Sequence, residues 1–128
     1  MRAFGKEYPL VLTVGAMEEI TARCPDRDIG RLKDLLDGST NDVVDFMVDF
    51  IAALSRGAEQ QRSFQAMVDG GIYSPNPITP EMLRALSQAD FTAAQTEAFR
   101  IWRGDQQPTV EVAEAKKNED AAPAPVSV

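Results

Sequence analysis

The sequence contains no histidine and a single cysteine, Cys24, and these shortages restrict the chemistry that the chain can perform. Without histidine the chain lacks the commonest general base and the commonest metal ligand. Cys24 has neither a histidine to activate it nor a second cysteine for an intramolecular disulfide, so we expect an idle thiol in a reducing compartment. The sequence therefore favours neither an enzyme nor a cofactor or metal site.

Basic residues are also scarce, with 13 Lys and Arg against 20 Asp and Glu and a formal net charge of −7. A phosphate-binding surface needs a concentration of Lys and Arg, so nucleic acid is not an expected partner. The run Arg100-Ile101-Trp102-Arg103 mixes basic and aromatic residues, but it is short and stands in an acidic chain. Basic or amphipathic protein segments fit this charge balance better.

Long apolar runs are absent as well. No segment approaches the ~20 apolar residues that span a bilayer, and the opening residues MRAFGKEYPL contain no apolar signal core or cleavage site. We therefore expect a soluble intracellular protein without a membrane partner. With 128 residues, 44% of them hydrophobic, the chain is long enough for one domain with a core.

The strongest pattern that is present is the stretch TNDVVDFMVDFIAAL, residues 40–54. Its large apolar residues recur at helical spacing, which predicts an amphipathic helix at the centre of the core. Asp42, Asp45 and Asp49 fall on the other side, where we expect a solvated face and not a cation site. Because glycine costs about 1 kcal/mol inside a helix, Gly57 predicts a kink or a break after this stretch.

The other expected elements pack around this helix. Residues 2–12 predict a β-hairpin with Gly5-Lys6 as its turn. Helices are expected at about 14–23, with Val14, Met17 and Ile20 inward, at about 28–37, from Thr79, and at about 91–103. The segment between Gly57 and Gly70 has an apolar edge of its own, formed by Phe64, Met67 and Val68.

Together these features predict a mainly α-helical bundle with an N-terminal β-hairpin over residues 1–104, followed by a disordered, acidic Ala/Pro-rich tail over residues 105–128. Three aromatic residues of the last helix, Phe91, Phe99 and Trp102, are candidate anchors for a protein partner, because tryptophan is enriched at interface hot spots. The alternative is that they close the core. Both uses obey the same helical periodicity.

The opening FGKEYPLVLTVGAMEEI resembles the start of the tail assembly chaperones of long-tailed, siphovirus-type phages and prophages. In that family a strand, a glycine turn and an E-Y-x-L strand precede a short helix that ends in paired acids, here Glu18 and Glu19. The Leu-rich short helix, the apolar DVVDFMVDFIAAL, the T-P-E-x-[LM] helix start at Thr79 and the charged tail are also similar. The resemblance covers about residues 2–103.

The resemblance implies a protein that is not an enzyme and needs no cofactor. It implies binding to the helical tape measure protein and recruitment of tail tube protein before tail polymerisation. It further implies the cytoplasm of the bacterial host and absence from the mature virion. The alternative is a small helical scaffold or structural virion component, which would remain in mature particles. A homo-oligomer is compatible with either function.

In many members of that family a programmed ribosomal frameshift near the end of the gene makes a longer product. Ala115-Lys116-Lys117-Asn118 would permit a −1 slip if A-rich codons encode Lys116 and Lys117. The alternative is a solvated lysine pair in the tail. The codons at Lys116 and Lys117 distinguish the two, because the protein sequence does not fix them.

Overall fold

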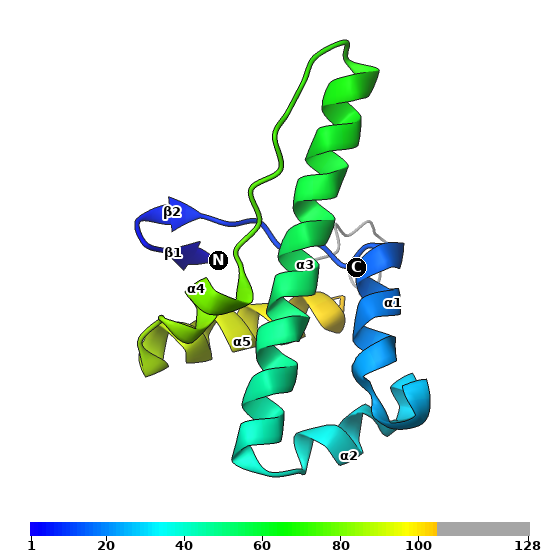
Figure 1. Cartoon of the computed structure of the whole chain (residues 1–128), viewed down its shortest axis with the longest axis vertical. Helices are drawn as coiled ribbons and strands as arrows, with labels where there is room; N and C mark the ends of the chain where they lie inside the picture. The colour runs from blue at the N-terminus through cyan, green and yellow to red at the C-terminus, as the bar shows by residue number, and fades with distance from the viewer. Residues whose placement is uncertain (105–128) are drawn as a thin grey trace, which may run out of the picture.

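The computed structural model describes residues 1–104, which form a mainly α-helical fold with an N-terminal β-hairpin (Figure 1). The predicted fold class is thereby confirmed. The predicted disordered tail, residues 105–128, lies outside the described residues, and so do Lys116 and Lys117.

The helices and strands follow the expected order along the chain. They are β1 (Arg2–Ala3), β2 (Lys6–Glu7), α1 (Val14–Arg23), the 3-10 turns η1 (Pro25–Arg27) and η2 (Ile29–Arg31), α2 (Leu32–Leu36), α3 (Thr40–Val68), α4 (Pro80–Arg84) and α5 (Gln88–Trp102). Figure 1 shows α3 as the axis of the molecule, with α1 beside it and α4 and α5 at its lower half. Side-chain caps fix four helix starts, at Thr13, Ser39, Thr79 and Ser87.

The core lies around the first half of α3, as the apolar stretch predicts. Its residues from Phe46 to Leu54 are buried on every side of the helix, apart from the half-buried Asp49. Neighbouring elements complete the core with Tyr8, Leu10, Ala16, Ile20, Ile78, Leu83, Ala94, Ala98 and Ile101. Burying each large side chain contributes about 1.5–3 kcal/mol, so α3 contributes more apolar stabilisation than any other single element.

The inner face of α1 differs from the prediction. Ile20 is buried as expected, but Val14 is 82% exposed and Met17 is 38% exposed, while Ala16 is buried. Ala16 and Ile20 are four residues apart and therefore share one side of the helix. The small side chain of Ala16 lets α1 approach α3 closely, and this turns Val14 outward.

The turn of the hairpin also differs from the predicted Gly5-Lys6. Ala3 pairs with Lys6, so the two central residues are Phe4 and Gly5, with φ of 53° and 74°. Two positive φ angles define a type I′ turn, in which glycine occupies the second central position. The strands are only two residues long, and the hairpin is held by packing of Tyr8 into the core.

The helix predicted at about 28–37 is shorter than expected. Only Leu32–Leu36 is α-helical, after the 3-10 turn η2. The Oδ1 atom of Asp28 accepts a hydrogen bond from the Gly30 amide at 2.9 Å. Such a local side-chain bond offers the backbone an alternative to the helix, which delays its start.

Gly57 neither kinks nor ends the helix, because α3 runs unbroken from Thr40 to Val68. A Cβ atom at Gly57 would lie 2.8 Å from Thr13 Oγ1 and 2.9 Å from the Val11 carbonyl oxygen. At this crossing the Val11 amide donates to the Leu54 carbonyl at 3.1 Å. The glycine is therefore required for the close approach of the chain before α1 to the backbone of α3.

Replacing Gly57 with Ala is expected to destabilise the fold by about 1–2 kcal/mol, because overpacking outweighs the gain of about 1 kcal/mol in helix propensity. Gly15→Ala in α1 is the matched control, since its Cβ would meet only Thr13 Oγ1 at 3.9 Å. That variant should be neutral or more stable by up to about 1 kcal/mol. Urea unfolding measures the change in the free energy of unfolding of each variant. An equal change in both would contradict the close approach of Thr13 to α3 at Gly57.

Candidate functional site

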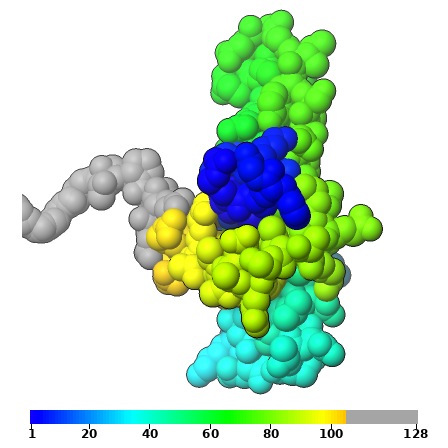
Figure 2. Space-filling view, turned by 90° about the vertical axis from the view of Figure 1, so that its left-hand side faces the viewer, coloured from blue at the N-terminus to red at the C-terminus, as the bar shows by residue number. Residues whose placement is uncertain are grey.

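The most conspicuous surface feature is a group of exposed apolar side chains at the end of α3. Phe64, Met67, Val68 and Ile72 are 66%, 65%, 80% and 97% exposed. We call these four residues the apical patch. Figure 2 shows the end of α3 standing above the rest of the described chain. Apolar side chains gathered on a surface in this way are typical of sites that bind proteins.

The segment that connects α3 to α4 runs back along the projecting helix and is fixed there by two buried polar side chains (Figure 1). Glu59 Oε1 accepts hydrogen bonds from the Tyr73 hydroxyl at 2.6 Å and from the Asn76 amide at 2.9 Å. Further down, Ser55 Oγ accepts a hydrogen bond from the Ile78 amide at 2.9 Å. One side of the projecting helix is thereby covered.

The helical residues of the apical patch lie on a different side of α3. With about 100° per residue, Phe64 and Val68 point within about 20° of the direction in which Gly57 meets Thr13. Glu59, which holds the connecting segment, points about 160° away from that direction. Phe64 and Val68 are therefore exposed because the returning chain, to which Ile72 itself belongs, covers the opposite side of α3.

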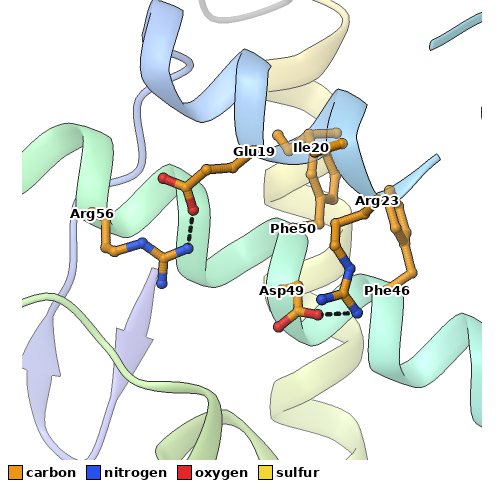
Figure 3. A pocket seen from close by; sticks show the side chains of 8 residues that line it. Glu19, Ile20, Arg23, Phe46, Asp49, Phe50 and Arg56 are labelled. Carbon is orange, nitrogen blue, oxygen red and sulfur yellow. Dashed lines mark hydrogen bonds and ion pairs between the residues drawn. The ribbon is translucent and has the colours of Figure 1, made fainter. Parts of the chain in front are cut away.

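A second candidate is a pocket of about 240 Å³ between α1 and α3 (Figure 3). Its charged residues are joined in pairs across the two helices. Arg56 binds Glu19, and Arg23 Nη2 lies 2.5 Å from Asp49 Oδ2. Because each carboxylate faces an arginine, the pocket offers no pair of free acids for general acid–base chemistry. The pairs join α1 to α3.

The acidic row of α3 has a similar part in the fold. It was predicted to be a solvated face, yet Asp49 pairs with α1, and Asp45 Oδ1 lies 3.0 Å from Arg84 Nη2 of α4. Only Asp42, at the first turn of α3, is fully on the solvent side and without an ion pair within residues 1–104. Within that range no group of three or more acidic or cysteine side chains could hold a metal ion.

The predicted partner anchor Phe91 lies half-buried at the start of α5. It lines an open groove of about 480 Å³ between α3, α4 and α5, together with apolar side chains of α3, of α4 and of the turn after α4. The groove walls are Val44, Val48, Leu83, Arg84, Leu86 and Gln88. Phe91 therefore remains available to a partner, and its role stays a prediction.

The other two predicted anchors, Phe99 and Trp102, stack on the core of the molecule. Their ring centroids lie 5.4 Å and 5.6 Å from that of Phe50, in a tilted and a T-shaped contact, and Phe50 in turn stacks on Phe46 at 5.6 Å. Both side chains are half-buried. They thus help to join α5 to α3 whether or not their exposed parts also bind a partner.

Cys24 follows α1 and is buried, and its Sγ donates to the Ile20 carbonyl at 3.4 Å. Burial, with a smaller contribution from the Asp28 carboxylate, raises the pKa of the Cys24 thiol. The thiolate is the reactive species, so the folded protein holds Cys24 in its unreactive form at neutral pH.

We expect iodoacetamide to alkylate Cys24 at least about tenfold more slowly in the native protein than in urea. The native rate should climb as the pH rises towards the raised pKa. The unfolded thiol, with a pKa near 8.5, ionises first, so stability should decrease above that pH. Mass spectrometry of quenched samples follows the reaction, and equal rates in both states would contradict the burial of this thiol.

No helix within residues 1–104 is both long enough and apolar enough to cross a bilayer. Comparisons of the chain with protein-family models, with curated proteins and with solved structures give no match. The resemblance described above and the geometry of the described residues therefore carry the functional proposal.

The sequence predicts Phe64, Met67 and Val68 only as the apolar edge of a segment after Gly57, and it marks none of the four residues of the apical patch as a site. The available signal was the position of Phe64, Met67 and Val68 beyond the run that fills the core. It could not be used, because the sequence does not show that α3 continues past every neighbouring helix.

Proposed function

We propose that this protein is a tail assembly chaperone of a long-tailed phage or prophage. It binds the tape measure protein and recruits tail tube protein by protein–protein contacts, in the cytoplasm of the bacterial host, and is absent from the mature virion. The observation that carries the proposal is the apical patch on a projecting helix of an acidic chain. The similarity of residues 2–103 to that family gives the partner.

The physical task is to keep a long helical protein from aggregating before assembly. Apolar stripes on such helices attract each other in water, and a chaperone covers them temporarily with an apolar surface of its own. The apical patch supplies such a surface without any rearrangement of the core. The net charge of −7 favours encounter with basic segments of the partner and keeps copies of the chaperone apart.

Co-expression with the product of the longest open reading frame just downstream tests this function. In the phage group that the chain resembles, that product is the tape measure protein. We expect the partner to become soluble and to co-purify with this protein. If the partner is expressed but stays insoluble and unbound, the proposed function is wrong.

Mass spectrometry of purified particles tests the remaining part of the proposal. A chaperone leaves before the tail is complete, so its peptides should be absent or far below one copy per tail. Peptides at the level of a structural protein would instead favour the scaffold or virion component that the sequence left open.

A further inference from the structure

We propose that the apical patch and the exposed start of α1 form one docking ledge for an amphipathic helix of the partner, with basic residues beside its apolar stripe. The ledge consists of Val14, Phe64, Met67, Val68 and Ile72. This inference rests on the proposed function and adds to it the surface that binds and the chemistry of the segment that is bound.

Two elements form the docking ledge: the projecting end of α3 forms its side, and the start of α1 forms its base. Thr13 touches α3 at Gly57, and α1 begins at the next residue, Val14, beside the base of the projecting part. With a rise of 1.5 Å per residue, Phe64 and Val68 stand about 10 Å and about 16 Å further along α3. A helix with its side chains is about 10–12 Å wide, so the side of the ledge matches the width of one helix.

On this side of α3 the docking ledge is uncharged, and its apolar side chains alternate with neutral polar ones. The patch residues are interleaved with Gln60, Gln61 and Gln65 on the same side of α3. Covering glutamine amides costs much less than covering charges, and the amides can bond to polar side chains at the edge of the bound helix. Such a surface is typical of helix-in-groove recognition.

The charges at the two ends of the ledge determine the kind of helix. Glu18 lies one turn beyond Val14 on the same side of α1. Asp69 follows Val68 at the end of α3, about 100° around the helix from it, and its Oδ1 accepts a hydrogen bond from Gln65 Nε2 at 3.2 Å. Neither acid forms an ion pair within residues 1–104. Arg62 is the basic residue nearest to Asp69 in the sequence, but it binds elsewhere. Its Nη1 lies 3.4 Å from the Tyr73 hydroxyl and 3.6 Å from Glu59 Oε2.

Both ends of the ledge are therefore negative, and basic residues on the bound helix would compensate them. A second copy of this chain would instead bring two acidic surfaces together, because each copy carries a net charge of −7. The charge pattern thus favours a basic amphipathic helix of another protein over self-association.

The test uses two labelled synthetic peptides with the same leucine stripe, one flanked by lysines and the other by glutamates. Fluorescence anisotropy should show that the lysine peptide binds at least about tenfold more tightly, and that salt weakens it. Phe64→Ser with Val68→Ser should weaken it at least about tenfold, since both side chains are buried only on binding.

Phe4→Ser is the matched control, because Phe4 is an aromatic residue that is 60% exposed at the hairpin turn, outside the ledge. It should change the affinity less than about twofold. The double substitution Glu18→Gln with Asp69→Asn should reduce the difference in affinity between the lysine peptide and the glutamate peptide. Circular dichroism checks that each variant keeps its helical content.

Equal binding of the two peptides, or unchanged binding by the Phe64/Val68 variant, would overturn the ledge. Wild-type dimers in sedimentation that the same variant abolishes would also overturn it, since the occupant would then be a second copy. If the downstream product co-purifies equally with wild type and variant, the ledge is wrong and the proposed function stands. If the lysine peptide binds as described but the downstream product does not, the proposed function is wrong and the ledge stands.

Discussion

Replacing Phe50 with Ala is expected to lower the free energy of unfolding by about 3–5 kcal/mol. Phe50 is fully buried in α3, and its ring contacts those of Phe46, Phe99 and Trp102. The substitution removes the ring that Phe99 and Trp102 of α5 contact, and it leaves a cavity between α3 and α5. Because small domains have only about 5–15 kcal/mol of stability, this loss should remove a large fraction of it. Urea unfolding followed by circular dichroism measures the loss.

Phe64→Ala is the matched control for this prediction. It makes the same substitution in the same helix, at a side chain that solvent already surrounds. The expected change is within about 0.5 kcal/mol, because a truncation there loses little packing. If the two variants differ by less than 1 kcal/mol, the assignment of Phe50 to the core and of Phe64 to a binding surface is wrong.

Glu59→Ala is expected to destabilise the fold by about 2–3 kcal/mol, the second largest effect. Glu59 is a residue of α3, and its buried carboxylate accepts hydrogen bonds from the Tyr73 hydroxyl and the Asn76 amide. Alanine leaves both donors without their acceptor and releases the connecting segment from the projecting helix. Hydrogen exchange should then increase at the amides after Gly70, together with a lower urea midpoint.

Tyr73→Phe is the control for Glu59, because it removes one of the two donors and retains the carboxylate. It should cost about 1 kcal/mol, the usual value of a single hydrogen bond. A loss in Glu59→Ala no greater than that in Tyr73→Phe would show that Glu59 does not fix the connecting segment. Neither substitution alters a residue of the docking ledge.

The parts of the fold that follow from local chemistry could be predicted from the sequence. The helices expected at about 14–23, over residues 40–54 and from Thr79 begin where the structure places them, because the hydroxyls of Thr13, Ser39 and Thr79 cap these starts. The apolar spacing of residues 40–54 placed the core correctly, because a helix with so many large apolar side chains has to bury them against its neighbours.

The parts that depend on contacts between distant segments could not be predicted. Gly57 looked like a helix breaker, since the sequence does not show that Thr13 crosses it. Val14 looked like a core residue, since its spacing from Ile20 does not show that Ala16 sets the closest approach of α1 to α3. In both cases tertiary packing overrides a local preference.

The candidate site was the least predictable part. Phe64 and Phe50 belong to one helical pattern, and the sequence contains no mark that separates the core from the projecting end. Phe99 and Trp102 are candidate partner anchors because tryptophan is enriched at interfaces, with closure of the core as the alternative, and the structure shows that both contact Phe50. Whether a side chain faces a neighbour depends on where the neighbouring helices end, which is a property of the whole fold.

The soluble yield of the downstream product is the measurement that tests the proposed chaperone activity most directly. It should be compared after co-expression with the wild type, with the Phe64→Ser and Val68→Ser double variant, and with Phe4→Ser. We predict a soluble complex with the wild type and Phe4→Ser and an insoluble partner with the double variant. An insoluble partner in all three cultures, with expression confirmed, would contradict a chaperone that binds through the projecting end of α3.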